Sequence, residues 1–176
     1  MHDNASDLGV DTSRLAIGGQ SAGGGLSAGL AMLARDRGEV SLCFQFLGIP
    51  ELDHRLETPS MRAFIDTPMW SRPQAVRSWQ AYIGDDRTNV SPYASPAIAT
   101  DLTGLPPAYI TAMEFDPLRD EAIVYAMRLM EARVPVELHV FPGTFHGSAL
   151  ATHAQISRRG NAELMAVLKR GLRCDD

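Results

Sequence analysis

The sequence lacks the features that mark several large classes of protein. Only two cysteines occur in its 176 residues, Cys43 and Cys174. They lie far apart, which predicts free thiols in a reducing compartment rather than a disulfide framework. No apolar run approaches the roughly 18 residues that a membrane span needs, and the polar residues 1–4 do not resemble the start of a signal peptide. We therefore expect a cytoplasmic protein without a membrane span.

Patterns for nucleic acids, metals and phosphates are also missing. The formal net charge is −5, which argues against a nucleic-acid partner because such partners call for a basic patch. No two histidines have the spacing of helical metal ligands, and there is no Cys-x-x-Cys. The phosphate-binding pattern Gly-x-x-x-x-Gly-Lys-Ser/Thr does not occur. We expect neither a metal nor another cofactor.

What the sequence does contain is the alternation of an α/β domain. Hydrophobic residues make up 45% and charged residues 21% of the chain, as in ordinary globular proteins. Apolar runs alternate with helical segments, which predicts a mostly parallel sheet of about four strands covered on both faces. The expected strands are 14–17, 41–47, 108–113 and 136–141, and the expected helices are 26–35, 74–83, 120–132 and 157–172. In helix 120–132, we expect Ile123, Met127 and Met130 to form the packing stripe.

One stretch between the first strand and the first helix suggests chemistry. Gly-Gln-Ser-Ala-Gly at 19–23 places Ser21 in a turn so tight that its backbone must be strained, with Gly19 and Gly23 keeping the turn free of clashes. The helix N-terminus favours a developing anion, and the N–H of Ala22 is the natural first donor of an oxyanion hole. A chance match is easy among 15 glycines, so the interpretation depends on distant residues.

Two such residues follow later strands. Asp116 follows the third expected strand and His146 the fourth, and parallel strands bring their carboxyl ends together. The order Ser, Asp, His is that of the α/β-hydrolase triad. In these roles Ser21 attacks an acyl carbon, His146 takes its proton, and Asp116 orients the imidazole. Asp120 is a competing candidate for the acid.

A long segment without a strand signal, residues 53–104, separates the second and third expected strands. Its apolar side chains are either core or pocket wall, and we expect the segment to form part of the substrate pocket because it is inserted at the carboxyl edge of the sheet. These side chains are Met61, Phe64, Met69, Trp70, Trp79 and Tyr82.

The motifs at 19–24, 116–121 and 145–147, with further similarity at 95–96 and 101–107, together resemble the hormone-sensitive-lipase-like branch of the α/β-hydrolases. The resemblance implies hydrolysis of short-chain carboxylic esters without a cofactor. It places Ser21, Asp116 and His146 as the triad, with the Ala22 N–H in the oxyanion hole. Gln20 stands where many members carry Asp, and we expect this departure to be mild.

Members of this branch also have an N-terminal half, with several more strands and a His-Gly-Gly-Gly loop that supplies oxyanion donors. Residues 1–176 resemble the C-terminal portion of the catalytic domain. We therefore expect strand 14–18 to be an unpaired apolar edge that favours self-association, and weak ester hydrolysis by the isolated chain. Two rival functions stay open: a non-catalytic binding or assembly module on this scaffold, and a thioesterase or amidase.

Overall fold

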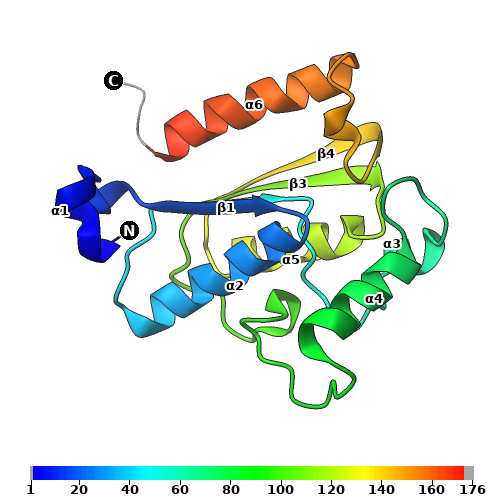
Figure 1. The fold of residues 1–176 in the computed structure, drawn as a ribbon, viewed down its shortest axis with the longest axis horizontal. Coiled ribbons are helices and arrows are strands. Elements are labelled where there is room, and N and C mark those ends of the chain that lie inside the picture. The colour runs from blue at the N-terminus through cyan, green and yellow to red at the C-terminus, as the bar shows by residue number, and fades with distance from the viewer. Residues whose placement is uncertain (1, 173–176) are drawn as a thin grey trace.

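A computed structural model describes residues 2–172, in which four strands form one parallel sheet (Figure 1). The strands lie in the order β1-β2-β3-β4, so each pairs with the next along the chain. This arrangement confirms the predicted fold class. The bounds are β1 Ala16–Gln20, β2 Phe44–Gly48, β3 Ala108–Phe115 and β4 Val136–Phe145. Cys174 lies outside the described residues, and Cys43 is a free cysteine.

Helices cover both faces of this sheet (Figure 1). Helices α2 and α5 lie on one face and α6 on the other. Because the strands advance in one direction and parallel crossovers are right-handed, the helices that link β1 to β2 and β3 to β4 must share a face. The helices are α1 Ala5–Leu8, α2 Ala22–Arg37, α3 Pro59–Ala63, α4 Arg72–Ile83, α5 Arg119–Glu131 and α6 Gln155–Gly171.

Each face of the sheet has its own core. Under α2 and α5, Leu47 of β2 and Ile110 of β3 are fully buried and pack with the side chains of both helices. Under α6, Phe46 and Tyr109 stack on each other and contact Val167. The apolar residues of the strands therefore face both layers, which is the burial that a covered parallel sheet requires.

The predicted packing stripe of α5 is wrong. Met127 and Met130 are 51% and 49% exposed, and the helix instead buries a neighbouring stripe that contains two alanines. Small side chains at these positions let the helix approach the sheet closely, whereas helical periodicity alone does not choose between adjacent stripes. The buried residues of α5 are Glu121, Ala122, Tyr125, Ala126 and Leu129.

Strands β3 and β4 run further toward their carboxyl ends than the sequence predicts. Pairing continues past an irregularity near Met113 to the pair Phe115 and Phe145. Pro142 and Gly143 lie inside β4, although these residue types usually end a strand. The extension matters because Asp116 and His146 are the next residues along each strand.

At the other side of the sheet, β1 pairs only with β2 among the described residues. This is the unpaired strand edge that the sequence predicts. No helix within residues 2–172 combines the length and the apolar character needed to cross a bilayer.

A pair of substitutions in α5 tests the observed stripe. Leu129 is fully buried, so Leu129→Ala should lower the free energy of unfolding by about 2–5 kcal/mol. Met127→Ala, on the exposed stripe, should change it by no more than about 0.5 kcal/mol. Urea unfolding followed by circular dichroism measures both. Equal losses in the two variants would contradict the assignment of the stripes.

Candidate active site

The structure places Ser21 in the sharp turn between β1 and α2. Its backbone φ is 58°, a left-handed value that is uncommon for a residue with a side chain. Besides the bonds that its carbonyl accepts from Gly24 and Gly25 of α2, two hydrogen bonds tie this backbone to β2 and the connection after it. The Ser21 N–H donates to the carbonyl of Gly48 at 2.8 Å, and the Ser21 carbonyl accepts the N–H of Glu51 at 3.1 Å. The end of β2 and the connection after it therefore keep the strained residue in position.

The glycines around Ser21 do not contribute equally to this turn. A Cβ on Gly19 would lie 2.4 Å from the carbonyl oxygen of Gly23, so the predicted need for glycine at 19 is confirmed. A Cβ on Gly23 would meet nothing within 4 Å, so the predicted steric role of that residue is wrong. The close approach occurs instead at Gly25, where a Cβ would lie 1.9 Å from the Glu51 carbonyl oxygen.

The register of β3 and β4 brings Asp116 and His146 together. Phe115 and Phe145 are paired across the two strands, and Asp116 and His146 are the residues that follow them. Asp116 is 1% and His146 is 8% exposed. The Asp116 carboxylate accepts the Leu118 N–H on Oδ1 at 2.9 Å, an Asx-type turn that fixes its orientation. Its Oδ2 lies 2.7 Å from His146 Nδ1.

The hydrogen bonds continue from His146 to the nucleophile candidate. His146 Nε2 lies 2.9 Å from the hydroxyl oxygen of Ser21. With the ring proton assigned to Nδ1, where Asp116 accepts it, Nε2 accepts the Ser21 hydroxyl proton. The competing carboxylate, Asp120, is engaged elsewhere: it accepts the Ser60 N–H at 2.7 Å and pairs with Arg119. Of the two candidates for the acid, only Asp116 therefore contacts His146.

Ala22 begins α2 next to this line of hydrogen bonds. The first amide groups of a helix have no carbonyl partner four residues earlier, and the helix dipole adds positive potential there. The Ala22 N–H therefore has no acceptor within its own helix.

A cavity of about 430 Å³ adjoins Ser21 and His146. Its walls come from the ends of the strands, from the loop after β4 and from α6, which sequence reasoning did not place near the site. Aliphatic and aromatic side chains dominate, among them Ile49, Met113, Phe141, Ile156 and Leu164. The cavity is therefore suited to an apolar group attached to the reacting atom.

Residues of the 53–104 segment approach the site from another side. The ring of Trp70 stacks on His146 with centroids 5.6 Å apart, and Met69 lies beside Gly147. Trp79 and Tyr82 line a smaller cavity, of about 130 Å³, that Ala22 and other residues also border. Met61 and Trp79 are core residues, since both are buried.

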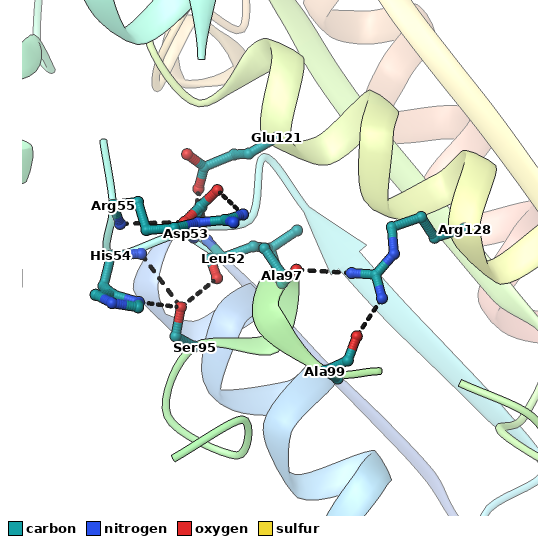
Figure 2. Close-up of polar contacts among 9 residues, drawn as sticks. All are labelled: Leu52, Asp53, His54, Arg55, Ser95, Ala97, Ala99, Glu121 and Arg128. Atoms are coloured by element: carbon teal, nitrogen blue, oxygen red, sulfur yellow. Dashed lines mark hydrogen bonds and ion pairs between the residues drawn. The ribbon is translucent and has the colours of Figure 1, made fainter. Parts of the chain in front are cut away.

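Glu121, a residue of the 116–121 motif, anchors the connection that follows β2 (Figure 2). Its buried Oε1 accepts the N–H groups of Leu52 at 2.5 Å and Asp53 at 3.2 Å. Burial raises the pKa of the Glu121 carboxyl well above its usual range, and the nearby carboxyl of Asp53 adds to this shift. Glu121 therefore holds two backbone amides, and its burial favours the neutral form of the carboxyl.

Ser95 secures the same connection from the opposite side (Figure 2). Its hydroxyl donates to the Leu52 carbonyl at 3.0 Å and accepts the backbone N–H of His54 at 3.2 Å. The His54 ring also contacts this hydroxyl at 2.9 Å. Arg128 of α5 donates to the carbonyls of Ala97 and Ala99, which fixes the segment that carries Ser95.

Trp70 was predicted as core or pocket wall, and it lies against His146. Glu51 and Glu121 contact the site or its support but were given no role by sequence reasoning. Glu121 had one detectable signal, because it is an acidic residue within the buried stripe of α5. Within residues 2–172, no three His, Cys, Asp or Glu side chains gather closely enough to hold a metal ion.

A parallel α/β sheet with a serine elbow after one strand, and an acid and a histidine after two later strands, defines the α/β-hydrolase class. A family model for the alpha/beta hydrolase fold matches residues 1–150. The chain belongs to this family, and the resemblance to its hormone-sensitive-lipase-like branch is confirmed.

Several relatives are similar over nearly the whole chain. Carboxylesterase NlhH of Mycobacterium tuberculosis is 41% identical over 97% of this chain and 54% of its own length. An arylesterase of Saccharolobus solfataricus is 36% identical over 95% of this chain and 54% of its own length. The solved structure of bacterial heroin esterase has a TM-score of 0.93 and is 59% identical, covering 97% of this chain and 56% of its own. The chain thus spans about half the length of the relatives it matches.

Gly25→Ala and Gly23→Ala test the packing behind the elbow. The added methyl at 25 collides with the Glu51 carbonyl, so we expect a loss of about 1–3 kcal/mol in the free energy of unfolding. The methyl at 23 meets open space, and alanine favours a helix by up to about 1 kcal/mol over glycine. Thermal and urea unfolding compare the two. A more stable Gly25→Ala variant would contradict the close approach.

Proposed function

We propose that this chain carries the catalytic triad of a carboxylic-ester hydrolase, with Ser21 as nucleophile, His146 as general base and Asp116 as the orienting acid. The observation that supports this proposal is the continuous line of hydrogen bonds, 2.9 Å from Ser21 to His146 and 2.7 Å from His146 to Asp116. The three residues come from the ends of three strands, β1, β3 and β4.

In the first half of the reaction, the Ser21 oxygen attacks the ester carbonyl carbon while its proton passes to His146 Nε2. The resulting imidazolium stays hydrogen-bonded to the Asp116 carboxylate, which keeps its negative charge. The tetrahedral intermediate then collapses and the carbon–oxygen bond to the alcohol breaks. The departing alcohol oxygen takes the proton from His146, and the acyl group remains on Ser21.

In the second half, water repeats the attack. His146 takes a proton from the water as its oxygen bonds to the acyl carbon. The bond to the Ser21 oxygen then breaks, and the same proton returns to that oxygen as the carboxylic acid leaves. In both halves we propose that the Ala22 N–H donates a hydrogen bond to the oxyanion. One such donor raises kcat by a factor of about 10²–10³.

The substrate we propose is a small ester with an apolar portion. The cavity beside Ser21 is lined mainly by apolar side chains, which suits an acyl chain or an apolar alcohol. The relatives are named as a carboxylesterase, an arylesterase and a heroin esterase, and ester hydrolysis is common to these names. We propose that segment 53–104 completes the pocket, since Trp70 already packs on His146.

Labelling with a fluorophosphonate probe tests the nucleophile. An activated serine forms a covalent adduct with such a probe, so the wild-type chain should be labelled and Ser21→Ala should not. Ser27→Ala is the matched control, because Ser27 lies on α2, just after the turn, and its hydroxyl donates to the Gly23 carbonyl. Labelling is read by mass spectrometry. Equal labelling of the wild type and Ser21→Ala would remove Ser21 from the proposed site.

A second pair of variants tests the acid. Asp116→Asn should lower kcat by a factor of up to about 10⁴, because an amide in this position favours the wrong imidazole tautomer. Asp120→Asn should lower it far less, since Asp120 contacts Ser60 and Arg119 rather than His146. Turnover of p-nitrophenyl acetate measures both variants. A larger loss in Asp120→Asn would show that the wrong carboxylate had been chosen.

A further inference from the structure

A second, smaller cavity lies beside the nucleophile turn. Its volume is about 130 Å³, and Ala22, the residue that follows Ser21, is part of its wall. Ser21 itself lines the larger cavity, so the two cavities reach the turn at successive residues. The rest of the smaller wall comes from α2, from α4 and from the segments before and after α4: Gly25, Leu26, Glu51, Ser78, Trp79, Tyr82 and Ala94.

The acidic side chain in this wall belongs to Glu51, which is only 5% exposed. Ser78, which lines the same cavity, donates to its Oε2 at 3.0 Å. The other oxygen, Oε1, is buried and has no hydrogen-bond partner among the described residues. A buried carboxyl left half-satisfied is costly, which points to a partner that residues 2–172 do not supply.

The backbone at Glu51 is held from both sides. Its N–H donates to the Ser21 carbonyl at 3.1 Å, and its own carbonyl packs against Gly25. The next two amides, of Leu52 and Asp53, donate to a buried carboxyl of α5 (Figure 2). The backbone that carries the Glu51 carboxyl is therefore in a fixed position relative to the nucleophile turn.

The chemistry of this wall favours a cation that carries an N–H. An anion would face the Glu51 carboxyl, and an apolar group would leave Oε1 unpaired. A metal ion needs several ligands, and no three His, Cys, Asp or Glu side chains gather for one within residues 2–172. A protonated amine would donate to Oε1 in a charge-assisted hydrogen bond. Its alkyl groups would meet Trp79 and Tyr82, and aromatic rings are common walls for alkylated ammonium groups.

We propose that the smaller cavity is a subsite for a protonated amine, in which Glu51 Oε1 accepts the ammonium N–H. The inference rests on the proposed function, because it extends the ester bound at Ser21 past Ala22 into this cavity. The acyl chain then occupies the larger, apolar cavity, and the alcohol portion occupies the smaller one. The substrate class is an ester of an amino alcohol with an alkylated nitrogen.

The charge of Glu51 makes this subsite sensitive to pH. Burial raises the pKa of its carboxyl to about 7. Ser78 and His146 oppose this rise, whereas Asp116 adds to it. On α5, the carboxyl of Glu121 also experiences the charge of Glu51, and α2 contributes no charged side chain to the wall. The carboxyl is mainly neutral at pH 6 and mainly ionised at pH 8, so a cation should bind more tightly at the higher pH.

A pair of isosteric esters tests the proposal. The amine of 3-(dimethylamino)propyl acetate stays protonated above neutral pH, as aliphatic amines do, and 4-methylpentyl acetate has carbon in place of the nitrogen. At pH 8 we expect kcat/KM to favour the amine ester by about tenfold, the effect of one charge-assisted hydrogen bond. The ratio of the two values should fall toward one at pH 6. Protonation of His146 affects both esters alike, so it cancels in the ratio.

Glu51→Gln removes the charge, and it should fold because glutamine has the same shape and keeps an acceptor for Ser78. In this variant the ratio should be close to one at both pH values. Glu57→Gln is the control, because Glu57 lies on the same connection and is exposed, and it should keep the wild-type ratios. A preference for the amine that survives Glu51→Gln would overturn the proposal. So would a wild-type ratio that is equal at pH 6 and pH 8, a result that needs no variant.

Binding without turnover separates this inference from the proposed function. The indole N–H of Trp79 is buried without an acceptor among the described residues, and Trp79→Phe assigns its NMR signal. At pH 8 we expect 3-(dimethylamino)propan-1-ol to move this signal in the wild type but not in Glu51→Gln, and 4-methylpentan-1-ol to move it little in either. That result in a chain that hydrolyses no ester would sink the proposed function and leave the amine subsite in place. Equal responses to the two alcohols would overturn the subsite, whatever the esterase assay shows.

Discussion

The two hydrogen bonds that tie the backbone of Ser21 to β2 and to the connection after it are the constraint on which the site depends. A serine at φ 58° relaxes unless its neighbours over-determine it. Here Gly48 accepts its N–H and Glu51 donates to its carbonyl, so the end of β2 and the following connection hold both sides of one residue. Gly25 lets that connection approach α2, because a methyl group there would overlap the Glu51 carbonyl.

The sheet then brings Asp116 and His146, the other two residues in the line of hydrogen bonds, to the same edge. Pairing of β3 with β4 up to Phe115 and Phe145 sets the residues after them, Asp116 and His146, side by side. Buried carboxyls near this edge have different partners. Asp116 contacts His146 and a backbone amide, whereas Glu121 holds two backbone amides of the connection after β2. Burial raises the pKa of the Glu121 carboxyl.

Much of this arrangement could be predicted from the sequence. The glycines around Ser21 indicate a tight turn, and the parallel alternation of strands and helices implies that residues after three strands meet. The α5 stripe could not be predicted, because Met127 has the hydropathy of a core residue while the alanines that replace it give no comparable signal. The role assigned to Gly23 failed for a related reason, since the tight contact depends on where the connection after β2 runs.

Other contacts of the site depend on the long connection between β2 and β3. Glu121 was given no role, and its partner Leu52 is 69 positions away. Trp70 was predicted only as core or pocket wall, because nothing local indicates its contact with His146. A polar residue in such a segment looks solvated until its partner is known. The path of that connection is set by tertiary contacts such as those of Ser95 and Arg128, which leave no periodic pattern.

The central claim is that Ser21 is an activated nucleophile in this chain. Its most direct test is intact-mass spectrometry of the protein mixed with p-nitrophenyl acetate and quenched in acid within the first turnover. The account predicts one added acetyl group per chain, which peptide mapping locates on Ser21 and which disappears as water hydrolyses it. A chain that stays unmodified, or that carries acetyl groups only at other positions, would contradict it.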